Sequence, residues 1–144
     1  MTTRRDDPYA NFNFLVEAEG EQIAAFSEVE LPGAEIEAIE YREGADKTAA
    51  SRKLPGRVKY GNVVLKRGVT GATELWQWFD AVRSGNLDRR TVRITLLDEA
   101  RTPVVAWTFH RAWPARYDAP DLNATGNDVA VETLELAHEG FDVD

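Results

Sequence analysis

The sequence predicts a mainly β (α+β) protein, with a small antiparallel β-barrel or sandwich, one packed α-helix and a long extended loop. Three observations predict this fold. Roughly seven short runs alternate apolar and polar residues with the period of a strand. Only one stretch has the apolar period of a helix, and the stretch Arg42–Gly56 has neither period. At 144 residues with 43% apolar content, the chain can bury a core, and we expect residues 1–144 to form a single domain.

The first part of the chain predicts three strands. Tyr9–Glu19 alternates as a half-buried strand, and a turn at Gly20 leads into Gln22–Glu30, so the two runs predict a hairpin. The next run places Ile36 and Ala38 on one side and two glutamates on the other. Such a strand has one face in water or against a polar partner.

The loop Arg42–Gly56 is long for a small domain, and loops beyond about 12–15 residues are usually functional or disordered. The chain has a formal charge of −8, but Arg42–Arg67 contains eight basic and two acidic residues, a net charge of +6. An acidic chain argues against a protein that grips nucleic acid. A basic segment on an acidic body predicts an arm that orders against a partner, although a plain surface loop remains an alternative.

The residues that follow predict a strand, a glycine break and the single helix. A valine-rich strand lies between Pro55-Gly56 and Gly68. Thr70 stands where an N-cap belongs, and Arg83 and Gly85 are stop signals. We expect one arc of this helix to pack on the sheet. Its candidate core residues are Leu75, Trp76, Phe79 and Val82, joined by Ala72 and Trp78.

The last third predicts three further strands. Thr91–Leu97 and Val104–Trp113 alternate and are joined by a hairpin loop at Asp98–Pro103. In the final run, Val129–His138, the phase of the valines differs from that of Leu134 and Leu136, which predicts a bulge.

No motif predicts an enzyme, and we expect no cofactor and no metal. The chain has no cysteine, which excludes a disulfide framework and a thiolate metal site. His110 and His138 lie in strand patterns without partners at metal-ligand spacing, so we expect structural or surface roles. No apolar run approaches the roughly 18 residues of a membrane span, and the N-terminus does not read as a signal peptide. We therefore expect folding in the cytoplasm and no membrane insertion.

The run RKLPGRVKYGNVVLKRG (Arg52–Gly68), followed by W-x-W-F in the helix, resembles the inner tube protein of contractile phage tails and phage-tail-like contractile injection systems. The resemblance extends over the whole chain. It implies a structural subunit that assembles as stacked hexameric rings around a cargo-conducting lumen inside a contractile sheath. The implied partners are copies of the chain, sheath protein, baseplate and tube-initiator proteins, a tail-terminator cap and cargo.

The resemblance also implies where subunits meet. The long loop of the family is its inter-ring contact, which corresponds here to Arg42–Lys59. Head-to-tail stacking needs two complementary faces, and a basic arm on an acidic body supplies them. The candidate contact residues are Arg42, Lys47, Arg52, Lys53, Leu54, Pro55, Gly56, Arg57 and Lys59, with Pro55-Gly56 expected to form a return bend.

A tube that conducts cargo needs a polar wall, and two acidic strand phases are candidates to face the lumen. These are Glu17 with Glu19, or Glu35 with Glu37, although an outer face would also be polar. The sequence of the motif is more similar to that of injection systems than to that of DNA-delivering phages. An injection system can be released from the cell. The tail tube of a DNA-delivering phage is the near alternative. From a different class, a free-standing acidic β-domain could bind a protein partner through its basic loop.

Overall fold

The structure, a computed structural model, describes residues 13–23, 26–41, 52–69, 71–124, 126 and 130–144. The chain divides into two compact units. Residues 1–31 and 62–144 form the first, here called the body, and residues 32–61 form the second, here called the hairpin unit. In the described residues, the body contains an eight-stranded sheet and one helix, and the hairpin unit contains a two-stranded sheet.

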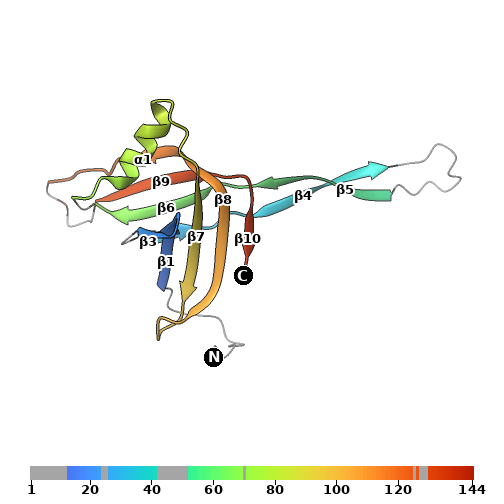
Figure 1. The fold of residues 1–144 in the computed structure, drawn as a ribbon, viewed down its shortest axis with the longest axis horizontal. Helices are drawn as coiled ribbons and strands as arrows, with labels where there is room; N and C mark the ends of the chain where they lie inside the picture. The colour runs from blue at the N-terminus through green and yellow to red at the C-terminus, as the bar shows by residue number, and fades with distance from the viewer. Residues whose placement is uncertain (1–12, 24–25, 42–51, 70, 125, 127–129) are drawn as a thin grey trace, which may run out of the picture. The chain divides into compact units, whose positions relative to one another are not determined.

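The body is an antiparallel sheet with the strand order β2-β1-β7-β8-β9-β6-β3, and β10 also pairs with β8 (Figure 1). The two ends of this order, β2 and β3, do not pair with each other in the described part of the chain, so the sheet does not close into a barrel. The strands of the body are β1 (Asn13–Ala18), β2 (Glu21–Ile23), β3 (Phe26–Glu30), β6 (Val63–Gly68), β7 (Arg90–Leu97), β8 (Pro103–Asp118), β9 (Val131–Ala137) and β10 (Phe141–Val143).

The long strand β8 belongs to both halves of this sheet. Its first part pairs with β7, and its last part pairs with β9. Three register shifts each leave one extra residue on β8. One lies between Pro103 and Val105, one lies near Arg111, which has a φ of 52°, and one lies between Pro114 and Arg116. Such bulges bend a strand and increase its twist. A single curved strand therefore joins the two halves, as Figure 1 shows.

The core lies between the sheet and the helix, and most of the predicted alternation leads into it. Val16 and Ala18 of β1, and Val92 and Ile94 of β7, are buried. The tight turn after Ala18, with Glu19 and Gly20 both at positive φ, returns the chain into β2, so the predicted first hairpin is confirmed. The predicted hairpin between β7 and β8 is confirmed as well. Together these elements confirm the predicted mainly β fold with one packed helix.

The helix α1 (Glu74–Arg83) begins later than predicted. Its N-cap is Thr73 rather than Thr70, which lies outside the described residues. Glu74 in the first turn and Arg83 in the last suit the helix dipole. The end agrees with the prediction, because Gly85 has a φ of 96° and its N–H donates to the Val82 carbonyl at 3.1 Å.

Three strand predictions are wrong in detail. The run from Pro55 to Gly68 is not one strand, because Gly61 and Asn62 separate β5 (Arg52–Tyr60) from β6. Gln22–Glu30 is also divided, since β2 pairs with β1 whereas β3 pairs with β6. The bulge expected in the last strand is absent from the pairing of β9 with β6, and the extra residue lies on β8 instead.

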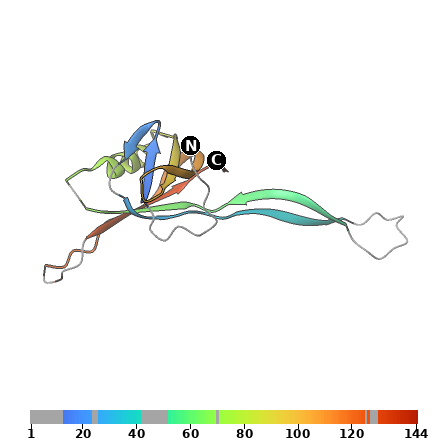
Figure 2. The ribbon, with the colours of Figure 1, turned by 90° about the horizontal axis from the view of Figure 1, so that it is seen from below.

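The hairpin unit consists of β4 (Ala34–Tyr41) and β5, paired antiparallel as a twisted ribbon (Figure 2). At its base, the Gly61 N–H donates to the Gly33 carbonyl at 3.1 Å. Every residue of β4 is exposed, so this strand has two open faces rather than the single polar face that its alternation predicts. A two-stranded ribbon with no packed face is marginally stable in water.

Candidate functional site

The predicted contact residues between positions 52 and 59 lie on strand β5 and not in a loop. All of them are exposed except Gly56, which is half-buried. Arg42 and Lys47 lie outside the described residues. Pro55 and Gly56 form no return bend, because both belong to the extended strand β5. The segment predicted as an arm is therefore, where it is described, one half of a β-ribbon.

A bulge in β5 divides the ribbon into two parts. Val58 pairs with Ile36, but the next pair is Ala38 with Pro55, so β5 has one residue more than β4 across this step. Gly56 lies at the bulge beneath the side chain of Ile39. A Cβ on Gly56 would lie 2.6 Å from the Ile39 Cδ1 atom and 3.1 Å from the Glu37 carbonyl oxygen, so a larger residue here would require the Ile39 side chain to move.

The bulge places apolar side chains on both faces of the ribbon. Along β4 the side chains alternate, so Ile36 and Ile39, three residues apart, lie on opposite faces. Cross-strand partners share a face, and their exposed fractions range from 40% to 59%. The first apolar patch contains Ile36, Val58 and Tyr60, and the second contains Ile39, Leu54 and Tyr41.

The basic residues that gave the segment its charge of +6 are distributed differently from the prediction. Lys66 and Arg67 belong to β6 in the body. On the ribbon, Lys59 lies opposite Glu35 and Lys53 lies opposite Glu40. Residues 32–61 contain six basic and five acidic residues, a net charge of only +1. The ribbon is therefore nearly neutral overall, and its most distinctive surface is apolar.

The four candidate lumen glutamates lie in two different units. Glu17 is half-buried on β1 and pairs with Arg93 of β7, whereas the Glu19 carboxylate accepts a hydrogen bond from the Thr91 N–H at 2.6 Å. Glu35 and Glu37 are exposed on β4. The body therefore brings the first pair together at the end of β1, and the hairpin unit holds the second pair.

A buried ionic cluster in the body was not predicted. Arg67 and Glu132 are 2% and 5% exposed, and the Arg67 Nε donates to a Glu132 carboxylate oxygen at 2.6 Å. The same guanidinium pairs with Glu74 at the start of α1, and the Tyr117 hydroxyl donates to Glu132 at 2.7 Å. The cluster therefore connects β6, β8 and β9 to the first turn of the helix.

The ionisation of this cluster follows from its burial and its hydrogen bonds. Burial alone would disfavour the charge of Arg67, but its hydrogen bonds with Glu74 and Glu132 outweigh it and raise the pKa of the guanidinium. The hydrogen bond from Arg67 lowers the pKa of Glu74. Burial, assisted by the hydrogen bond to Glu132, raises the pKa of Tyr117 to about 12. At neutral pH the cluster thus contains charged Arg67 and Glu74 and a neutral phenol.

The packing of α1 agrees only in part with the predicted arc. Leu75 is buried, and Phe79 and Val82 are half-buried against the core. Trp76 is 36% exposed, so the prediction that it is a core residue is wrong. Its ring lies 5.3 Å from Tyr117 with an edge-to-face tilt, and the Arg83 guanidinium lies 5.0 Å from its centroid. The neighbouring Trp78 takes the buried position instead.

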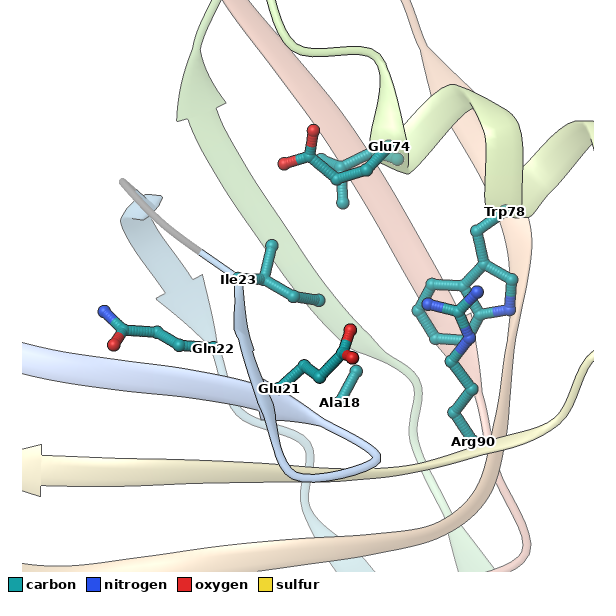
Figure 3. Close-up of a pocket in the computed structure, with 8 residues that line it drawn as sticks. Ala18, Glu21, Gln22, Ile23, Glu74, Trp78 and Arg90 are labelled. Carbon is teal, nitrogen blue, oxygen red and sulfur yellow. The ribbon is translucent and has the colours of Figure 1, made fainter.

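A small pocket opens beside the buried face of α1 (Figure 3). The guanidinium of Arg90 stacks on the indole of Trp78, 4.6 Å from the ring centroid, and pairs with Asp88 at 2.8 Å. The Trp78 Nε1 atom donates to the Asp88 carbonyl at 2.7 Å. Arg90 and Trp78, two of the residues that line this pocket, therefore hold the helix to the start of β7.

Two further observations limit the chemistry of the described residues. His110 lies 2.7 Å from Asp142 of β10, and the His138 Nδ1 accepts the Gly140 N–H at 3.1 Å. The first contact holds β10 to β8, and the second lies within the turn between β9 and β10. Across the described ranges, no cluster of three potential ligands could hold a metal ion. No described helix is both long and apolar enough to span a bilayer.

Comparison with known proteins identifies the family. The structure is similar to a chain of the sheath–tube complex of the extracellular contractile injection system PVC in its extended state. That chain is 28% identical, with a TM-score of 0.83 over 96% of this chain and 93% of the other. It is also similar to a chain of the tube-terminating cap of the anti-feeding prophage, with 25% identity, a TM-score of 0.84 and coverage of 100% and 95%. A chain of the anti-feeding prophage baseplate is 29% identical, with a TM-score of 0.75 over 99% of this chain and 97% of that one.

A comparison with curated protein sequences finds no match. Residues 10–142 match the family model described as T4-like virus tail tube protein gp19. That match covers nearly the whole chain, including both the body and the hairpin unit. The chain therefore belongs to the T4-like virus tail tube protein family.

Proposed function

We propose that this chain is the inner tube subunit of a phage-tail-like contractile injection system. One observation carries the proposal, namely the likeness, over 96% of the chain, to a chain of a sheath–tube complex at 28% identity. In this function residues 1–144 act as one tail-tube domain. Six copies form a ring, rings stack head to tail, and the stacked rings enclose a lumen through which cargo passes inside a contractile sheath.

The proposed partners follow from the same likeness. The relatives come from complexes described as sheath–tube, cap and baseplate structures. We propose that this chain likewise contacts sheath protein, a baseplate with its tube initiator, and a terminator cap. The particle assembles in the cytoplasm, and its role is structural rather than enzymatic. The tail tube of a DNA-delivering phage is the second candidate, which the name of the matching family favours.

The proposed inter-ring contact is the segment Arg42–Lys59, of which the structure describes residues 52–59. Support comes from the open faces of the ribbon, since an isolated two-stranded ribbon gains little stability in water and is stabilised by packing. The glutamates Glu17 and Glu19, or Glu35 and Glu37, remain the proposed lumen residues. Because the two pairs lie in different units, a tube reconstruction can assign one pair to the lumen and the other to a subunit contact.

The test is the assembly state of the purified full chain. Negative-stain electron microscopy of concentrated protein, with a crowding agent to favour nucleation, should show sixfold rings and hollow tubes. Replacing β4 and β5 with a short Gly-Ser connection should leave the body folded by circular dichroism and remove the tubes. A wild-type protein that stays monomeric by sedimentation at every concentration would contradict the proposal. It would favour the free-standing binding domain.

A further inference from the structure

The first half of α1 is attached to the rest of the body at two points on one side of the helix. The Glu74 carboxylate pairs with the guanidinium of Arg67 on β6. One turn later, the Trp78 Nε1 atom donates to the Asp88 carbonyl at 2.7 Å. A pocket of about 170 Å³ lies between the two attachments, with Glu74 at one end and Trp78 at the other (Figure 3). Leu75 lines this pocket and is only 1% exposed, so the first turn covers it beside open space.

The first turn has little other polar support. Thr73 is the N-cap, but its side chain makes no capping hydrogen bond, and its hydroxyl accepts the Gln77 side-chain amide at 3.0 Å instead. A first turn without a side-chain cap is less stable, because its backbone N–H groups lack partners within the helix. Arg67 pairs with Glu74 and also donates to the Ala72 carbonyl at 3.4 Å. The guanidinium of Arg67 therefore holds this end of the helix to the sheet.

Arg67 does not depend on Glu74 to stay paired. Its Nε atom donates to Glu132 at 2.6 Å, and Glu132 also accepts the Tyr117 hydroxyl at 2.7 Å. Breaking a buried ion pair is costly when it leaves a charge buried without a partner. If Glu74 moves away, Arg67 keeps Glu132, and the Glu74 side chain, already 46% exposed, enters water. The start of α1 can therefore leave the sheet without leaving an unpaired buried charge behind.

The second attachment is firmer than the first. The Trp78 side chain is buried, and the Arg90 guanidinium covers its indole, 4.6 Å from the ring centroid. Moving Trp78 would take its N–H away from the Asp88 carbonyl, and an unsatisfied buried donor is unfavourable. The backbone of α1 also lies closest to β8, away from the pocket side formed by β1 and β2. A movement of the first turn would therefore pivot at Trp78.

We propose that the first turn of α1, residues 74–77, is a lid on the pocket, that the pair of Glu74 and Arg67 latches it, and that it opens about Trp78 while the sheet stays folded. The open form widens the pocket into a cleft between the helix and the β1–β2 hairpin and uncovers Leu75. One partly exposed carboxylate thus sets the population of the open form. This inference concerns the single subunit and does not depend on the proposed tube function.

The test uses thiol labelling of the full chain, which contains no cysteine of its own. Two single-cysteine reporters lie on either side of the pocket: Leu75→Cys on the lid and Ala18→Cys on β1, whose native residues are 1% and 4% exposed. The second reporter leaves Leu75 in place. Ala112→Cys, at a position of β8 that is 0% exposed, reports unfolding of the sheet. Circular dichroism melting checks that each variant is folded.

Each reporter is combined with three changes to the helix. Glu74→Gln removes the charge of the latch. Glu74→Asp keeps a negative charge near the helix N-terminus but shortens the side chain, so the pair with Arg67 is lost. The matched control is Asp80→Asn, which removes the same charge from an exposed pair with Arg83 on the same helix and does not touch the latch.

The measured quantity is the rate of labelling by an excess of a small maleimide at neutral pH. Without a helix change, both pocket reporters should react at least about tenfold faster than Ala112→Cys, because local opening needs less free energy than global unfolding. Glu74→Gln and Glu74→Asp should each raise the rates at the pocket reporters about threefold to tenfold, the range for loss of a partly exposed ion pair. Asp80→Asn should change them less than about twofold, and the rate at Ala112→Cys should stay constant.

Three outcomes would overturn the lid. Equal rates at all three reporters would show that the pocket opens only when the whole subunit unfolds. Equal acceleration by Asp80→Asn and Glu74→Gln would show that helix stability, and not the latch, controls access. A Glu74→Asp protein that labels like the unchanged one would show that charge near the helix N-terminus is sufficient without the pair. None of these results bears on tube formation, so the proposed function is tested separately.

Discussion

The buried pair of Arg67 and Glu132 gives the sharpest prediction for the isolated subunit. Glu132→Leu keeps most of the side-chain volume but removes the acceptor of both Arg67 and Tyr117. The guanidinium is 2% exposed and cannot regain water without a rearrangement. Removing one partner of a buried pair costs about 3–5 kcal/mol. Because Arg67 retains Glu74, we expect the lower end, about 3 kcal/mol of the free energy of unfolding.

The assay is urea unfolding of the subunit followed by tryptophan fluorescence, with circular dichroism melting as a second measure. A loss of about 3 kcal/mol corresponds to a melting temperature lower by roughly 6–12 °C for a chain of this size. The matched control is Glu135→Leu on the same strand. Within the described part of the chain its carboxylate accepts one exposed hydrogen bond, from Asn62 at 3.2 Å, so its loss should cost less than about 1 kcal/mol.

A double variant separates the loss of a pair from the exposure of a lone charge. Arg67→Met combined with Glu132→Leu removes both charges and replaces them with apolar groups. Such replacements of buried pairs are often neutral or stabilising. The double variant should therefore be more stable than Glu132→Leu alone by about 2 kcal/mol or more. If Glu132→Leu costs no more than Glu135→Leu, or if the double variant is the least stable, the reasoning about this cluster is refuted.

Three further predictions concern the titration of Tyr117, the packing of α1 and the bulge of the ribbon. The pKa of Tyr117 is raised to about 12 from about 10 in the unfolded chain, so its neutral form stabilises the fold fully below about pH 10 and this contribution declines as pH rises toward 12. Tyr117→Phe should reduce the alkaline loss of stability, and identical profiles of urea midpoint from about pH 9 to about pH 11.5 would contradict this. Leu75→Ala should reduce the free energy of unfolding in urea by about 2–5 kcal/mol, and Trp76→Ala should reduce it by less, because Leu75 is buried and Trp76 is partly exposed. The reverse order would show that Leu75 does not lie on the buried side of the helix. Gly56→Ala should displace the side chain of Ile39 and raise the protein concentration needed for tube formation, without changing the melting temperature of the body. Unchanged assembly would show that tube formation does not depend on the position of the Ile39 side chain.

The strands with one buried face were predictable from sequence, because alternation reports burial directly. Val16 with Ala18, and Val92 with Ile94, are buried as their spacing indicates. Alternation could not show that the run from Pro55 to Gly68 serves two sheets. Its apolar residues continue across Gly61 and Asn62, while their partners change from β4 to β9. Pairing partners are a tertiary property that a local pattern does not contain.

Two charged residues of the body lie in the buried phases of their strands. Val63 and Leu65 are buried, and Arg67 continues their phase. Leu134 and Leu136 are buried, and Glu132 precedes them in the same phase. Two opposite charges in buried phases of two strands could have predicted the ion pair. Val131, at the start of β9, is exposed, so its difference in phase from Leu134 and Leu136 reflects a change of face and not a bulge.

The position of the candidate contact segment was predicted from the sequence, but its secondary structure and its charge balance were not. Charge counting made the segment look strongly basic, since it included Lys66 and Arg67 of the body and omitted the glutamates of β4. The register of the ribbon was needed to show that Lys59 and Lys53 lie opposite acidic residues. The same register was needed to divide the apolar residues between two faces.

The order of the strands has a consequence for how the chain is made. β6 lies between β3 and β9, and β1 lies between β2 and β7, so both early strands await partners from the last half of the chain. At a synthesis rate of about 5–20 residues per second, roughly 3–14 s separate the completion of β6 from that of β9. Throughout that interval the ribbon, with its uncovered isoleucines, precedes a body that cannot yet close its core. We therefore expect the nascent chain to expose apolar surface until β9 has been made, because sheets with non-local pairing close slowly and late.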